Sequence, residues 1–411
     1  MKFNKSSQLL LVSAVSLLVA GMITACGTLT TDFVYVASSR AAGPNNYGEI
    51  DVYEINAVSG EMRQIPTSPF PSGGRNPVAE AVSSDYLSLY VVNHDDNTIV
   101  QFVIGPDGKL YPQSTVNTPG IYPMAAAVNG TSLFVLDTYQ PLPICSNAEP
   151  CSGSVGVYPV LPASGSGSTA IPSGGLGPSV SNPANGSTYW PLTVPGSPND
   201  VIVPTAINVL KSGAYVYVTA YDASVTPNIG YVFGFSVGSG GALTSLGAKV
   251  AGVNPSAIAS DSTGSYVYVT DSSSAQLFAY AINSNGALSE LAGSPIQTGN
   301  QPSATVADPK YPYLYVANAL DGTVSCYSIG SNGAPANIGT YPTGIQPVAI
   351  GIDPSTSHFL FTLNFLANGA SGTVSDFEID PTSGALVHTQ GSPYTSNAQP
   401  TAVAAVPHKT S

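Results

Sequence analysis

The chain has 411 residues, of which 43% are hydrophobic and only 8% are charged, and it contains 42 Gly, 35 Pro and 23 Tyr. This composition is rich in strand and turn formers, which argues against a mainly helical protein and against a disordered one. The formal net charge of −13 excludes a typical nucleic-acid-binding protein, because such proteins present a basic surface.

The first 25 residues have the features of an export signal. Two lysines precede an apolar run at residues 9–20, and small residues then lead to Cys26 in the sequence ITACG. This order resembles the lipobox of bacterial lipoproteins, in which the cysteine is lipidated and becomes the first residue. The resemblance predicts a signal peptide at residues 1–25, a lipid-anchored tether at 26–31, and a place in the bacterial cell envelope, which would be the outer membrane or periplasm if the cell is Gram-negative. An ordinary signal peptide with a chance cysteine is the alternative.

Removal of the signal peptide changes the charge balance further. It leaves eight Lys and Arg against 23 Asp and Glu, a formal net charge of −15. The surface of such an acidic protein repels anionic lipid head groups, so we expect the acyl chains on Cys26, rather than the protein surface, to anchor the protein in the bilayer.

From residue 32 onward the chain repeats a unit of four short strands. The first strand follows a Pro-x-Ala motif, the second is an aromatic–aliphatic run such as YVYVTD, and the third ends in an aromatic residue two places before an aliphatic one. A glycine-containing turn such as NGAL opens the fourth strand in most units. The seven Pro-x-Ala prolines are Pro77, Pro123, Pro204, Pro255, Pro302, Pro347 and Pro400. Repeated four-stranded units are typical of a β-propeller, since one blade cannot bury both of its faces alone.

The two ends of the repeat array are complementary. The array begins with a second strand, FVYVAS, and ends with a first strand, PTAVAAV, so the last segment is expected to complete the first blade. The sequence therefore predicts an all-β fold over residues 32–407: a seven-bladed β-propeller of four-stranded blades, closed by the C-terminal strand joining the first blade. A stack of two unrelated β-domains is the alternative.

The third unit is longer than the others because it carries two insertions, at about residues 138–152 and 161–190. The first contains Cys145 and Cys151. Export favours a disulfide between them over a metal-binding pair, since no histidine or third cysteine stands near. The second has the composition of a loop and holds Trp190, which we expect to cover a blade edge rather than to stack on a ligand.

The YVT-type second strands, the third strand DGTVSCYSI and the NGAL turns resemble the bacterial seven-bladed propeller lactonase family, known for 6-phosphogluconolactonases, and the YVTN-repeat surface proteins. The resemblance covers nearly all of residues 32–407 and implies the propeller fold. Lactonase members often carry a histidine directly after the blade proline, with arginine and acidic partners in the central cleft. Here that position holds Val, Met, Thr or Ser. A phosphorylated substrate would also need a cluster of cations, which eight Lys and Arg in the exported chain do not suggest.

In propellers, the loops between second and third strands share one face with the loops between blades, and ligands usually enter there. On this face we expect Arg75 and the run His94, Asp95 and Asp96, in which an imidazole beside carboxylates suits acid–base chemistry near neutral pH. Polar residues at or near the second-strand ends are predicted as binding residues: Asp137, Tyr221, Asp222, Asp271, Asn318 and Asn364. Turn formation by Asn and Asp is the simplest explanation of such residues. A ring of oxygens that could hold Ca²⁺ is the alternative, and no cofactor is certain.

The sequence contains no Gly-x-Ser-x-Gly elbow, HExxH or Walker motif. We therefore expect a lipid-anchored binding or scaffold module of the cell envelope that holds an envelope protein or glycan at its loop face and contacts the bilayer through acylated Cys26. The alternative is an exported lactone hydrolase, a carboxylic ester hydrolase acting on a sugar-type lactone, with His94, Asp95, Asp96 and Arg75 as catalytic residues.

Overall fold

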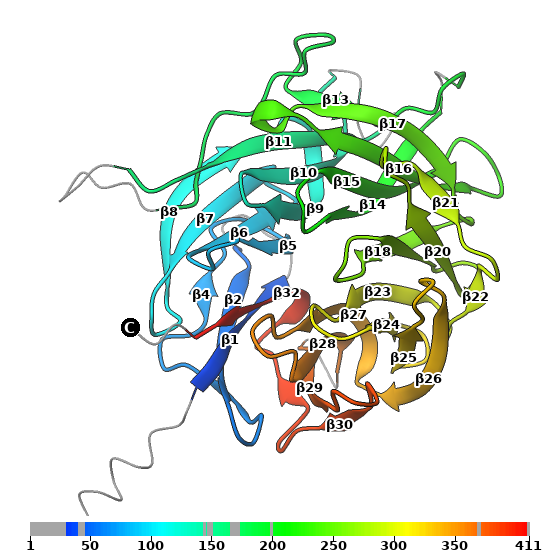
Figure 1. Ribbon diagram of the computed structural model, residues 1–411. Coiled ribbons are helices and arrows are strands. Elements are labelled where there is room, and N and C mark those ends of the chain that lie inside the picture. The colour runs from blue at the N-terminus through cyan, green and yellow to red at the C-terminus, as the bar shows by residue number, and fades with distance from the viewer. Residues whose placement is uncertain are drawn as a thin grey trace, which may run out of the picture.

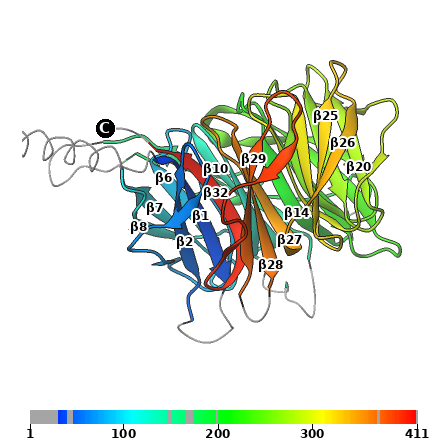
Figure 2. The same ribbon diagram turned by 90° about the horizontal axis from the view of Figure 1, so that it is seen from below.

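The computed structural model describes residues 30–39, 46–142, 145, 151–164, 173–197, 200–367 and 371–408. Over these residues the chain forms seven antiparallel sheets arranged as the blades of a ring (Figure 1). Seen from the side, strands such as β1, β2, β27 and β28 run across the thickness of the ring (Figure 2). The helical structure in the described residues is one 3₁₀ turn, Ser239–Gly241. The predicted all-β, seven-bladed propeller is confirmed.

The innermost strand of each blade contains the Pro-x-Ala motif. The blades are numbered in chain order from the one that contains the start of the described chain. Their innermost strands are β32 (Gln399–Pro407) in blade one and then, from blade two to blade seven, β5 (Pro77–Val82), β9 (Ile121–Asn129), β14 (Ile202–Val209), β18 (Pro255–Ser260), β23 (Pro302–Ala307) and β27 (Ile345–Ile352). Each contacts the innermost strands of both neighbouring blades, so they form a closed circle around the axis. In every blade the residue between proline and alanine is skipped in the pairing with the second strand. The motif is therefore a β-bulge, a place where proline's missing N–H is tolerated.

The second strands are the aromatic–aliphatic runs, and they are buried on both faces. They are β1 (Thr30–Ser39), β6 (Ser88–Asn93), β10 (Ser132–Tyr139), β15 (Tyr215–Asp222), β19 (Tyr266–Asp271), β24 (Tyr313–Asn318) and β28 (Phe359–Leu366). Alternate side chains face opposite neighbours: Phe33 and Tyr35 pack against blade two, whereas Val34 and Val36 pack against blade seven. Burial on both faces explains why these strands are continuously apolar instead of alternating.

The third strands are β2 (Glu49–Asn56), β7 (Thr98–Ile104), β11 (Ser154–Leu161), β16 (Ile229–Val237), β20 (Gln276–Ile282), β25 (Thr323–Ile329) and β29 (Thr373–Ile379). The outer position differs between alternate blades. Blades two, four and six have one strand there: β8 (Leu110–Asn117), β17 (Leu243–Val250) and β26 (Pro335–Pro342). In blades one, three, five and seven the outer strand is divided into two short strands, and both pair with the third strand of the blade. In that blade order the short strands are β3 (Met62–Gln64) and β4 (Phe70–Pro71), β12 (Gly175–Leu176) and β13 (Tyr189–Pro191), β21 (Leu288–Glu290) and β22 (Ile296–Gln297), β30 (Leu386–His388) and β31 (Tyr394–Thr395).

A Ser-Pro dipeptide lies at the break of the outer strand in blades one, five and seven. In each case the serine hydroxyl accepts a hydrogen bond from a backbone N–H of the third strand. The bonds run from Val52 to Ser68 (2.8 Å), from Ala279 to Ser294 (3.0 Å) and from Asp376 to Ser392 (2.9 Å). The hydroxyl therefore replaces the backbone carbonyl that an unbroken strand would supply.

A tyrosine in the second strand joins five of the blades to the next one. Its hydroxyl donates to the carbonyl of a glycine that lies between the third and outer strands of the following blade. The bonds are Tyr35 to Gly108 (3.0 Å), Tyr90 to Gly174 (2.7 Å), Tyr217 to Gly286 (2.7 Å), Tyr268 to Gly333 (2.8 Å) and Tyr315 to Gly384 (3.1 Å). In blades three and seven this second-strand position is Phe134 or Phe361. The aromatic runs and the glycine turns of the repeat are thus two halves of one contact between blades.

The ring closes as the sequence predicts. Strand β32 pairs with β1 from Asp32 opposite Pro407 to Ser39 opposite Gln399, and the two strands lie side by side in Figure 1. Strand β1 begins at Thr30, two residues earlier than expected. The predicted lipidation site, Cys26, lies outside the described residues. No helix among those residues is both long and apolar enough to cross a bilayer.

The insertions of blade three also follow expectation. Cys145 and Cys151 form a disulfide with a Cα–Cα distance of 5.4 Å. Trp190 lies in β13, is only 5% exposed, and packs in the core shared by blades three and four. It therefore covers a blade edge. Part of the second insertion, expected as a loop, supplies the short outer strands β12 and β13.

Candidate functional site on the loop face

The second strands of all blades run in the same direction across the ring, which gives the ring two distinct faces. The loop face is the one where second strands end; it carries the connections from second to third strands and those between blades. The tether face is the opposite one, where second strands begin, and β1 starts there at Thr30. Residues 75–76 directly precede β5, and residues 94–97 directly follow β6. These two segments, which contain the predicted catalytic residues, therefore both lie on the loop face.

The structure brings the four predicted catalytic residues together. Nδ1 of His94 lies 2.7 Å from Oδ1 of Asp95. Arg75 holds Asp96 with two donors: Nε to Oδ1 at 2.6 Å, and the backbone N–H to Oδ2 at 2.7 Å. Arg75 also donates from Nη2 to the backbone carbonyl of Asp95 at 3.1 Å. One ion pair therefore fixes the loop that presents the His94–Asp95 pair.

The charge state of Asp95 determines which nitrogen of His94 is free. Partial burial alone would raise the pKa of Asp95, but hydrogen bonds from His94 and Asn76, together with the nearby charge of Arg75, outweigh it and lower the pKa below its ordinary value. The carboxylate is therefore ionised at neutral pH and can only accept a hydrogen bond. In the neutral imidazole, Nδ1 then carries the hydrogen and Nε2 keeps a lone pair. A hydrogen bond from Arg75 to Asp96 raises the pKa of the guanidinium, which stays charged.

Two tyrosines that the sequence analysis did not single out complete the site. The ring of Tyr122 stacks on His94, with centroids 4.8 Å apart and an angle of 10° between the planes. Tyr139 meets Tyr122 edge-on at 6.1 Å. We name Arg75, His94, Asp95, Asp96, Tyr122 and Tyr139 the loop-face cluster. The side chains of His94, Asp95 and Arg75 are 31%, 37% and 40% exposed, so a ligand can reach them.

Tyr122 could have been recognised in the sequence, because it is unusual for its position in the repeat. It stands directly before the blade proline, where Asn76, Gln301 and Gln346 occupy the same place in other blades. All four have a left-handed backbone, with φ between 53° and 58°. This conformation is a repeated feature of the fold, but it is costly for a bulky aromatic residue. Five of the other six blades have an amide at this position and blade four has Val203, so an aromatic residue there distinguishes blade three.

The remaining predicted binding residues lie in the second strands near their loop-face ends, and all but Tyr221 are buried. Asp137, Asp222, Asp271, Asn318 and Asn364 are at most 2% exposed. Asp271, for example, accepts backbone N–H bonds on both oxygens, including those of Ser273 and Ser274 at 2.9 Å. Tyr221 is half-buried inside β15.

A glycine packs directly against most of these second-strand ends. A β-carbon added to Gly299 would lie 2.6 Å from Cγ of Asn318, and one on Gly344 would lie 2.5 Å from Cγ of Asn364. Each glycine stands three residues before a blade proline, a Gly-x-x-Pro pattern that the sequence analysis overlooked. Asp222 and Asp271 accept hydrogen bonds from the backbone of their own turns. Asn318 and Asn364 instead donate to third-strand serine hydroxyls. The ligand-binding role expected of these residues stays a prediction.

Among the residues that the structure describes, no group of three or more His, Cys, Asp or Glu side chains is arranged to hold a metal ion. Oδ2 of Asp137 accepts a hydrogen bond from the Gly120 N–H, and both oxygens of Asp271 accept from backbone N–H groups, among them those of Asn254 and Ser273. Calcium binding at the loop face stays a prediction.

Comparison with known proteins places the fold among the lactonase-like propellers. Residues 215–338 and 292–404 match the family model described as "Lactonase, 7-bladed beta-propeller". No curated protein sequence matches the chain. The periplasmic gluconolactonase of Pseudomonas aeruginosa and a proposed 6-phosphogluconolactonase of Bacteroides fragilis each share 18% identity with it, at a TM-score of 0.66. Both alignments cover 92% of this chain and 99% of the other. Residues 215–404 are therefore similar in sequence to the seven-bladed lactonase propellers, and the solved structures extend that likeness, as a fold, to the whole ring.

Proposed function

We propose that this protein is an exported propeller, held at the cell envelope by a lipid on Cys26, whose loop-face cluster binds a polyhydroxylated ligand such as an envelope glycan. The observation that carries the proposal is the stack of His94 on Tyr122 beside ionised Asp95. A flat ring surface beside a strong acceptor suits a sugar ring, which has an apolar C–H face and hydroxyls around its edge. The acidic protein disfavours an anionic ligand.

Two further observations support an exported, anchored protein. The Cys145–Cys151 disulfide suits an oxidising compartment outside the cytoplasm. The sequence before Thr30 has the lipobox order described above.

Hydrolysis of a sugar-type lactone at the same cluster is the second candidate, and the lactonase family match favours it. In this reaction Nε2 of His94 would take a proton from a water molecule while the water oxygen attacks the lactone carbonyl carbon. Arg75 would stabilise the negative charge on the carbonyl oxygen, and Asp95 would hold the imidazolium. The ring C–O bond then breaks, and the alkoxide leaving group takes the proton back from His94, giving the hydroxy acid.

The residues after the blade prolines argue for binding over catalysis. Where lactonase family members often have a histidine, Ser256, Ser303 and Thr401 donate hydrogen bonds to the proline carbonyl of the next blade, at 2.6, 2.6 and 2.7 Å. These side chains contribute to packing between blades and leave no acid–base group at their positions.

The test combines binding and turnover on purified protein lacking the signal peptide. Calorimetry with neutral oligosaccharides and a turnover assay with simple aldonolactones are run on the wild type, on Tyr122→Ala and on His94→Ala. The matched control is His358→Ala, because His358 also bonds a carboxylate, Glu378 at 3.1 Å, but lies outside the loop-face cluster.

Saccharide binding that is lost in Tyr122→Ala and kept in His358→Ala is the expected result. Lactone turnover that disappears in His94→Ala alone would establish the second candidate instead. Absence of both binding and turnover in the wild type would refute the assignment of this cluster as a saccharide site.

A further inference from the structure

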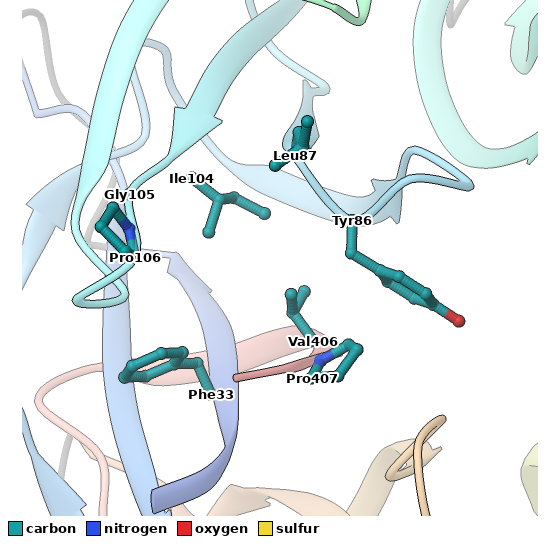
Figure 3. A pocket seen from close by; sticks show the side chains of 8 residues that line it. All are labelled: Phe33, Tyr86, Leu87, Ile104, Gly105, Pro106, Val406 and Pro407. Atoms are coloured by element: carbon teal, nitrogen blue, oxygen red, sulfur yellow. The ribbon is translucent and has the colours of Figure 1, made fainter. Parts of the chain in front are cut away.

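The tether face carries an apolar pocket of about 130 Å³ between blades one and two. Figure 3 shows Ile104 opposite Phe33 and Val406 across the opening, with Leu87 and Pro106 at its sides. A second depression of about 420 Å³ adjoins it and shares Phe33 and Pro106. Thr30 lines this second depression, so both hollows lie where the described chain begins.

Two exposed apolar side chains project from the tether face of the same two blades. Val58, in the turn between β2 and β3, is 88% exposed, and Leu87, in the turn between β5 and β6, is 38% exposed. Both turns lie on the tether face because they follow the ends of third and first strands. Apolar residues that project from the surface beside a lipid anchor can enter the boundary between head groups and acyl chains.

The few cations of the chain also favour this face. Six Lys and Arg lie in the described residues, and four of them are in turns or strand ends of the tether face: Arg63, Lys109, Lys211 and Lys310. Arg63 pairs with Glu54, and Lys109 pairs with Asp107 at 2.5 Å. Around the pocket these pairs cancel local negative charge that would otherwise repel a lipid surface.

The length of the tether restricts where the bilayer can be. Cys26 precedes Thr30 by four residues, and four residues of extended chain span at most about 14 Å. An acylated Cys26 therefore keeps Thr30 within that distance of the membrane surface. This step rests on the proposed lipid anchor.

We propose that the tether face of blades one and two lies against the lipid bilayer, with Val58, Leu87 and the apolar pocket in contact with it. The loop-face cluster then points away from the membrane. Second strands of six to ten residues rise about 3.3 Å per residue, so the cluster stands at least about 20 Å further from the bilayer than the tether face. Its ligand is reached from the aqueous side.

The experiment anchors the protein chemically, so that it does not depend on natural lipidation. The chain from Cys26 onward is coupled through the Cys26 thiol to a maleimide lipid in phosphatidylcholine vesicles. Cys326 is buried and the other two cysteines form the disulfide, so Cys26 is the accessible thiol. Tryptophan is introduced at Val58 (Val58→Trp) on the tether face or at Leu320 (Leu320→Trp) on the loop face. These residues are 88% and 73% exposed, and Trp190 is a buried background.

Vesicles with and without brominated acyl chains are compared. We expect bromine to quench at least about a third of the added fluorescence in Val58→Trp and none of it in Leu320→Trp. Equal quenching at both positions, or quenching at neither, overturns the proposed orientation. Mass spectrometry of the natural mature protein tests lipidation separately. An unmodified Cys26 would refute the natural lipid anchor, whereas the vesicle experiment tests only which face of the ring contacts the bilayer.

Discussion

The hydrogen bond between the second-strand tyrosine and the next blade's glycine turn predicts a specific loss of stability in Tyr268→Phe. Tyr268 is fully buried, and its hydroxyl donates to the Gly333 carbonyl at 2.8 Å. Phenylalanine keeps the ring, as Phe134 and Phe361 do in blades three and seven, and leaves that carbonyl without this donor. Loss of such a bond costs about 1–2 kcal/mol.

The structure offers a matched control in the same strand. The hydroxyl of Tyr266 donates to Ser331 at 3.4 Å in an exposed place, so Tyr266→Phe should change the free energy of unfolding by less than about 0.5 kcal/mol. Urea denaturation gives the free energies, and calorimetry should show a fall of about 2 °C in the Tm of Tyr268→Phe, given the entropy of unfolding of a chain this long. Equal losses in the two variants would refute the idea that this bond holds neighbouring blades together.

Two further predictions concern pH and the broken outer strands. Burial raises the pKa of Asp137 from 3.8 to about 7, so the folded protein binds this proton more tightly than the unfolded chain, and the stability present below about pH 4 is lost as the pH rises to about 7. Asp137→Asn, which matches Asn318 and Asn364 at the same position in other blades, should gain up to about 4 kcal/mol above pH 7 and nothing at low pH; denaturation curves at both pH values check this, and equal gains would contradict it. Ser294→Ala should lower the hydrogen-exchange protection of the Ala279 amide, its 3.0 Å donor, by about fivefold to tenfold; unchanged protection would mean that the hydroxyl does not replace the missing carbonyl.

The fold could be predicted from the sequence because its determinants are local and repeated. The Pro-x-Ala bulge and the buried aromatic run recur in every unit, so both can be recognised in the amino-acid sequence. Closure by β32 was equally visible, since the order of the strand motifs at the two ends is complementary. The alternation of whole and broken outer strands was missed, although Ser-Pro at Ser68, Ser294 and Ser392 marked three of the four breaks.

The candidate site was predictable only in part. His94, Asp95 and Asp96 are adjacent in sequence, and Arg75 comes from the connection to the same blade, so topology alone predicts their meeting. Tyr122 and Tyr139 come from the next blade, and their contact with His94 depends on the left-handed backbone before Pro123. The ends of the second strands show the opposite limit. A row of Asn and Asp in the sequence suggests a binding ring, but in the structure these side chains are buried and most have a glycine packed against them.

The alternation of outer strands has a consequence for the symmetry of the ring. Whole outer strands occur in blades two, four and six and divided ones in blades one, three, five and seven, so the natural period is a pair of blades. Seven blades cannot be divided into such pairs, so two blades with divided outer strands must be neighbours at one place in the ring. These are blades seven and one, so the single mismatch in the pattern coincides with the seam where β32 completes the first sheet.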